Sequence, residues 1–78
     1  MVKKHILVGT IENVKKLCNV AMHTDCDIDL VSNRYVVDAK SIMGIFSLDL
    51  SKEIEIHVHT EDAAVADEFF AALGTMVR

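Results

Sequence analysis

The chain has 78 residues, of which 51% are hydrophobic, and its 8 Lys and Arg against 12 Asp and Glu give a formal net charge of -4. This length suits one domain spanning residues 1–78, and the apolar fraction argues against intrinsic disorder. The negative charge argues against nucleic acid and against an anionic membrane surface as partners. No apolar run approaches the roughly 20 residues that cross a bilayer. Because Cys18 and Cys26 are too few for a disulfide framework, we expect a cytoplasmic protein with reduced thiols.

The first elements are a strand and a helix. Residues 2–8 alternate in polarity and predict a strand, with Val2, Ile6 and Val8 facing inward. Thr10 is typical of a helix N-cap, and the following helix is predicted over residues 11–23. Its apolar stripe repeats at helical spacing and comprises Ile11, Val14, Leu17, Cys18 and Ala21.

A hairpin follows this helix. Ile28 and Leu30 are predicted to face inward, while Asp27 and Asp29 face outward. The segment Ser32-Asn33-Arg34 is typical of a tight turn. The next strand is expected to present Tyr35, Val37 and Ala39 on one face.

The second half of the chain repeats the strand and helix pattern. Ser41 is typical of an N-cap for a short segment that ends near Leu48. A strand then has Ile54, Ile56 and Val58 inward and Glu53, Glu55, His57 and His59 outward. We expect Thr60 to cap a last helix, whose apolar stripe is Val65, Phe69, Leu73 and Met76.

The predicted order is therefore β-α-β-β-α-β-α. Each strand has one apolar and one polar face, which calls for an antiparallel sheet covered on one face and wet on the other. We expect an α+β fold of the open-faced β-sandwich kind, with four strands covered on one face by three helices.

One short segment resembles a known family. Lys40-Ser41-Ile42-Met43-Gly44 is similar to the regulatory stretch of HPr, the phosphocarrier protein of the bacterial sugar phosphotransferase system, in Gram-positive bacteria. The order of elements agrees with that of HPr over nearly the whole chain. The resemblance implies the HPr fold, in which the fourth strand lies between the first and the second.

The phosphocarrier motif of HPr, Gly-x-His-x-Arg-Pro, is not matched. Counting back from Ser41, the histidine falls on Thr10, the arginine on Glu12 and the proline on Asn13. Phosphohistidine chemistry needs an imidazole and a cation for the phosphoryl oxygens. The sequence therefore predicts a degenerate member that has lost the phosphocarrier histidine, acts as no enzyme and needs no cofactor.

Ser41 is the regulatory candidate. The resemblance implies phosphorylation by an HPr kinase/phosphorylase and recognition by a catabolite-control repressor, as in Crh, the branch of the family that lacks the histidine. Such a partner is expected to bind Lys40, Ile42, Met43, Phe46 and Ser47. The plainer interpretations are that Ser41 only caps a helix and that the apolar residues belong to the core.

Three further alternatives stay open. One is a working phosphocarrier that uses another histidine. The others are a structural module and a metal-binding module, for which His57, His59 and His5 are the candidate ligands. We expect no bound metal, because spacing on one strand sets no coordination geometry. The short connection at Gly9 leaves both a monomer and a strand-exchanged dimer open.

Overall fold

The strands and helices follow the predicted order in a computed structural model that describes residues 1–33 and 35–78. The first half contains β1 (Val2–Ile6), α1 (Ile11–Met22), β2 (Ile28–Ser32) and β3 (Tyr35–Asp38). The second half contains α2 (Ile42–Phe46), β4 (Ile54–Val58), α3 (Ala63–Leu73) and a closing 3-10 turn, Gly74–Met76. The α+β prediction is confirmed.

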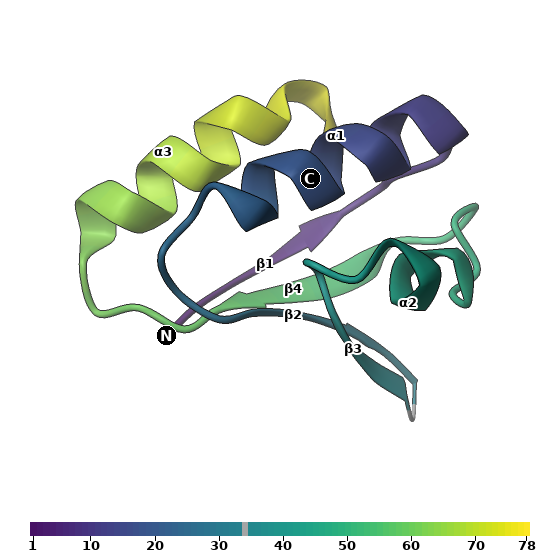
Figure 1. The fold of residues 1–78 in the computed structure, drawn as a ribbon, viewed down its shortest axis with the longest axis horizontal. Helices are drawn as coiled ribbons and strands as arrows, with labels where there is room; N and C mark the ends of the chain where they lie inside the picture. Colours follow the sequence, from purple (N-terminus) through teal and green to yellow (C-terminus); the bar gives the residue numbers. More distant parts are fainter. Residues whose placement is uncertain (34) are drawn as a thin grey trace.

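The four strands form one antiparallel sheet in the order β1-β4-β2-β3. The position of β4 between β1 and β2 agrees with the order that the HPr resemblance implies. All three helices lie on one side of this sheet, and α1 and α3 run side by side in opposite directions (Figure 1). The other face of the sheet is left open to solvent.

The core lies between the inward face of the sheet and the helices. The predicted inward residues of β4 are buried, as are Ile28 and Leu30 of β2 and Ile6 of β1. Helix α1 contributes Val14, Leu17, Cys18 and Ala21, and α3 contributes Ala66, Phe69, Phe70 and Leu73. Burying each large side chain of this set contributes about 1.5–3 kcal/mol to stability, which explains why these elements stay together.

Two predictions about the helices are wrong. Ile11 is 61% exposed and is not part of the buried stripe of α1, because it lies in the first turn, beyond the edge of the core. The N-cap of α3 is Asp62, whose carboxylate accepts a hydrogen bond from the Ala64 N–H, at 2.9 Å. Thr60 lies in the turn before this cap, where its hydroxyl oxygen accepts a hydrogen bond from the Asp62 N–H.

The strand predictions also need correction. β1 ends at Ile6, although Val8 beyond it is buried as expected. β3 lies at the edge of the sheet, so Tyr35 is exposed, Val37 is half-buried, and Ala39 is buried just after the strand. An edge strand has a neighbouring strand on one side only, and Tyr35 at its start is exposed.

The hairpin between β2 and β3 turns where the sequence predicts. Asn33 adopts a left-handed φ of 53°, a conformation that asparagine tolerates well. Arg34, the third residue of the predicted turn, lies outside the described residues. Across residues 1–33 and 35–78, no helix combines the length and the apolarity required to cross a membrane.

Candidate functional site

The connection between β1 and α1 is a tight turn built on Gly9. Its φ is 77°, and the Thr10 N–H donates back to the Val8 carbonyl at 2.9 Å, which closes a γ-turn. The Gly9 N–H donates to the Leu50 carbonyl at 3.0 Å. A positive φ of this kind costs an L-residue energy, so glycine is the residue suited to this position.

Thr10, Glu12 and Asn13 come together at the start of α1. The Thr10 hydroxyl oxygen accepts a hydrogen bond from the Asn13 N–H at 3.1 Å, so Thr10 is the N-cap, as predicted. The Asn13 side chain donates to the Val8 carbonyl at 2.7 Å. Glu12 is exposed in the first turn, where its charge interacts favourably with the helix dipole. The three residues therefore stabilise a helix start and place a negative charge beside it.

Ser41 caps α2, as predicted. Its Oγ accepts a hydrogen bond from the Gly44 N–H at 3.3 Å, and its side chain is exposed. The preceding turn is held by Asp38, whose carboxylate accepts from the Lys40 N–H at 2.8 Å and whose carbonyl accepts from the Ser41 N–H at 2.9 Å. The hydroxyl is therefore both held in a defined position and open to solvent.

Helix α2 has a buried and an exposed apolar face. Ile45 and, just after the helix, Leu48 are buried in the core. Ile42, Met43 and Phe46 are 37%, 76% and 42% exposed, and we call these three residues the α2 surface. The interpretation that all these residues belong to the core is therefore wrong for the α2 surface.

The other two residues predicted to bind a partner flank this surface. Lys40 is half-buried, and its carbonyl lies 3.5 Å from Cys18 Sγ, which packs α1 against the start of α2. Ser47 is exposed, and its hydroxyl donates to the Gly44 carbonyl at 2.6 Å. Gly44 itself packs closely on β3, because an added Cβ would lie 3.3 Å from Val37 Cβ.

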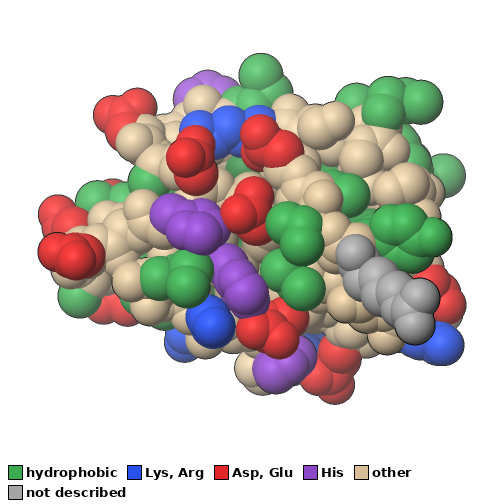
Figure 2. All heavy atoms as spheres, turned by 90° about the horizontal axis from the view of Figure 1, so that it is seen from below, with side chains coloured by type: hydrophobic (Ala, Val, Ile, Leu, Met, Phe, Trp, Pro, Cys, Tyr) green, Lys and Arg blue, Asp and Glu red, His purple; other side chains and the backbone are tan. Residues whose placement is uncertain are grey.

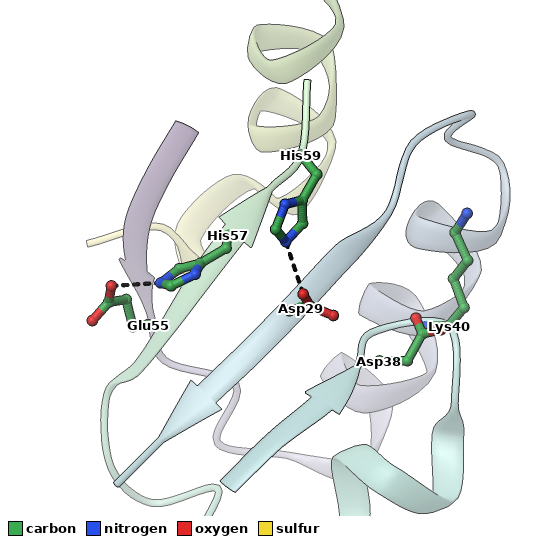
Figure 3. A network of polar contacts seen from close by, with 6 residues as sticks. All are labelled: Asp29, Asp38, Lys40, Glu55, His57 and His59. Atoms are coloured by element: carbon green, nitrogen blue, oxygen red, sulfur yellow. Dashed lines mark hydrogen bonds and ion pairs between the residues drawn. The ribbon is translucent and has the colours of Figure 1, made fainter. Parts of the chain in front are cut away.

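The histidines of β1 and the β4 region lie on the open face of the sheet. They form a band with carboxylates between them (Figure 2). His59 Nε2 lies 2.8 Å from Asp29 Oδ2 on β2, whereas His57 Nε2 contacts Glu55 Oε1 on its own strand at 2.5 Å. The two rings point to different carboxylates (Figure 3). His5 lies directly opposite Glu55 across the β1–β4 pairing.

These pairs set the electrostatics of the open face. The hydrogen bond from His57 is the largest influence on Glu55, and it lowers the pKa of that carboxyl below its ordinary value of 4.5. The charges of Lys3 and His5 on β1 act in the same direction. The pairing of β4 with β2 brings His59 to Asp29, whereas the His57–Glu55 pair lies within β4 itself.

The arrangement of the histidines and carboxylates on the open face bears on the metal-binding alternative. In residues 1–33 and 35–78, no group of three or more His, Cys, Asp or Glu side chains is placed to hold a metal ion. His57 and His59 each contact a different carboxylate, so they do not converge on one point. Cys18 is buried, and Cys26 is half-buried in the loop before β2; both are free thiols.

The sequence and the fold both match proteins of one family. The family model described as the PTS HPr component phosphorylation site matches residues 12–78. The chain belongs to the PTS HPr family. No protein in the curated collection of sequences matches the chain.

Solved HPr structures have the same fold. A phosphocarrier protein HPr from Bacillus anthracis str. Ames is 27% identical, with a TM-score of 0.72, covering 99% of this chain and 96% of that one. HPr-C-His from Thermoanaerobacter tengcongensis is 24% identical, with a TM-score of 0.74 and coverage of 94% and 86%. The histidine-containing phosphocarrier protein from a Mycoplasma is 20% identical, with a TM-score of 0.73 and coverage of 99% of both chains. The last two, below 25% identity, support the fold alone.

Proposed function

We propose that this HPr-family chain is a non-enzymatic regulatory or protein-binding module that acts through Ser41 and the α2 surface, and that it does not carry phosphohistidine. The observation that carries the proposal is the exposure of Ile42, Met43 and Phe46 beside a capping serine that is itself exposed. Methionine is flexible and polarisable, which suits a surface that adapts to a partner.

The start of α1 supports the loss of the phosphocarrier role. Thr10 stands where the HPr resemblance places the phosphorylated histidine, and its hydroxyl oxygen already accepts the capping hydrogen bond. Glu12 stands where an arginine would hold the phosphoryl oxygens, and its negative charge would repel them. Two other histidines, His57 and His59, each contact a carboxylate, which also repels a phosphoryl group.

Phosphorylation of Ser41 is chemically simple. The Ser41 Oγ forms a bond to the γ-phosphorus of ATP, the bond from that phosphorus to the bridging oxygen of ADP breaks, and the hydroxyl proton passes to a base of the kinase. The product places nearly two negative charges beside the Gly44 N–H at the start of α2. A partner would then bind the phosphate and the adjacent α2 surface together.

The partners we propose follow from family membership. An HPr kinase/phosphorylase would modify Ser41, and a catabolite-control repressor would recognise the modified form in the cytoplasm. Lys40 and Ser47 lie at the rim of the α2 surface, where polar contacts commonly surround an apolar centre.

The test is intact-mass spectrometry after two parallel incubations. The first contains ATP and an HPr kinase/phosphorylase, and the second contains phosphoenolpyruvate and enzyme I. We expect one phosphate in the first incubation only, which Ser41→Ala abolishes. Ser47→Ala is the matched control, because Ser47 is an exposed serine on the other end of the same helix.

The remaining outcomes contradict the proposal in different ways. Labelling from phosphoenolpyruvate would show a working phosphocarrier and would direct attention to the four histidines. Full labelling of Ser41→Ala by the kinase would remove Ser41 as the site. No labelling in either incubation would leave Ser41 as a helix cap and the α2 surface as a binding site without a phosphate switch.

A further inference from the structure

A groove of about 490 Å³ lies between α1 and α3. It is lined by the last turns of α1 and the loop after it, and by the middle of α3; none of its lining residues belongs to the α2 surface. The two helices run side by side in opposite directions here, so the end of α1 meets the first half of α3 (Figure 1). The groove is therefore a separate surface from the one that carries the proposed function.

The groove has an apolar floor and polar walls. Val20 of α1 and Val65 of α3 are half-buried in it, and Phe69 below them is buried. The walls include the exposed carboxylates of Asp25 and Glu68, from the two sides of the groove. This combination suits a ligand with an aliphatic stem and a positively charged head.

His23 lines the same groove, and the backbone of α1 holds its ring in place. Its Nδ1 lies 2.7 Å from the Asn19 carbonyl oxygen, which requires Nδ1 to carry a proton and donate it. The carboxylates of Asp25 and Glu68 are acceptors that match a guanidinium or ammonium group with several N–H donors.

The charge of the surrounding sequence favours the same kind of ligand. Residues 17–33 and 53–77, which supply every residue of the groove, contain no Lys or Arg. They hold nine of the 12 acidic residues of the chain, three in the first segment and six in the second. A cationic ligand therefore enters a region of negative potential without meeting a fixed positive charge on those segments.

We propose that this groove binds an arginine or lysine side chain presented by a basic segment of a partner protein. The aliphatic stem lies over Val20, Val65 and Phe69, and the charged head lies between Asp25 and Glu68. We commit to a protein segment as the carrier of this side chain, and a free organic cation of the same charge is one outcome of the test. This inference does not depend on phosphorylation of Ser41.

The test uses the whole chain, labelled with ¹⁵N, and a capped peptide with one arginine flanked by leucines. We expect shift changes at backbone amides of residues 19–25 and 65–72, and none at the α2 surface. The same peptide with citrulline in place of arginine keeps the shape but not the charge, and should bind at least fivefold more weakly.

Two double variants distinguish binding by the groove carboxylates from general attraction to the negative charge of the protein. Asp25→Asn with Glu68→Gln removes both groove carboxylates, and we expect a loss of about fivefold to tenfold in affinity, as exposed ion pairs allow. Asp27→Asn with Asp67→Asn removes the same charge from residues outside the lining and should leave the affinity within twofold. Equal melting temperatures of the two double variants check that both are folded.

Three results would overturn the proposal. Equal binding of the citrulline peptide would show that the charge is not recognised. Equal weakening by both double variants would show only non-specific attraction to an acidic protein. Groove shifts with free spermidine, but none with the arginine peptide, would make the occupant a small cation instead of a protein segment.

Discussion

His57 and Glu55 form a hydrogen-bonded pair on the open face of the sheet, two residues apart on β4, with 2.5 Å between Nε2 and Oε1. Both side chains project from the same face because alternate residues of a strand point the same way. The pair lies beside Lys3 and His5 of β1, whose charges also favour the ionised form of Glu55. This face therefore responds to pH through the carboxylate of Glu55.

Removal of the His57 ring should raise the pKa of Glu55. We expect His57→Val to return that pKa toward its ordinary value of 4.5, as measured by NMR titration of the carboxyl carbon. The folded-state pKa is lowered, so the stabilisation is present above about pH 4.5 and is lost as the pH falls through the folded-state value. The difference in unfolding free energy between wild type and the variant should therefore shrink as the pH falls through that value.

The control for this titration is His59→Val, since His59 contacts Asp29 instead of Glu55. This control introduces the same valine and also removes one imidazole, and it should leave the pKa of Glu55 unchanged. An equal rise in both variants would mean that the histidines act on Glu55 as general charges and not through the hydrogen bond.

The capping role of Ser41 predicts a measurable loss of stability. Ser41→Ala leaves the Gly44 N–H without its side-chain acceptor, and we expect a cost of about 1 kcal/mol in urea unfolding. Ser41→Asp keeps an acceptor at the cap and should lose less. Equal stability of Ser41→Ala and wild type would mean that water replaces the cap at no cost, leaving phosphorylation or binding as the use of this serine.

The two faces of α2 should differ in their sensitivity to truncation. Ile45 is fully buried, so Ile45→Ala should cost about 2–5 kcal/mol. Met43 is mostly exposed on the opposite side, so Met43→Ala should stay within about 0.5 kcal/mol of wild type. Chemical denaturation of the two variants measures both values, and a large loss for Met43→Ala would mean that the α2 surface is packed in solution.

The γ-turn at Gly9 should penalise any residue with a Cβ. Nothing lies within 4 Å of an added Cβ, so Gly9→Ala creates no clash. Its cost of about 1–2 kcal/mol comes from the positive φ alone. Unfolding by urea measures it, and no loss of stability would show that the turn relaxes to a negative φ.

The same turn allows a test of strand exchange between two chains. We expect wild type to have a monomeric mass by light scattering across a concentration series, because the turn is held by the Gly9–Leu50 and Thr10–Val8 hydrogen bonds. If Gly9→Ala shifts the mass toward a dimer, relief of the strained turn drives strand exchange. A dimeric wild type would contradict this expectation.

The sequence alone determined the order of elements, the inward faces of β2 and β4 and the caps at Thr10 and Ser41. These are local properties: alternation and helical spacing follow from backbone geometry, and a cap bonds only to residues a turn away. The Lys40–Gly44 segment added the family, which the match over residues 12–78 confirmed. The same reasoning identified Thr10, Glu12 and Asn13 as neighbours, because they share one helix turn.

The tertiary structure decided what depends on contacts between distant residues. Tyr35 and Ile11 are apolar and fit the strand and helix patterns, yet they are exposed because they lie at the edge of the sheet and the end of a helix. The exposure of Met43 beside buried Ile45 depends on how α2 sits on β3. The α1–α3 groove also joins residues far apart in the chain, and its sequence signals are the lack of Lys and Arg in both segments and their many acidic residues. Burial is set by which surfaces meet, and a local pattern carries no information about the partner surface.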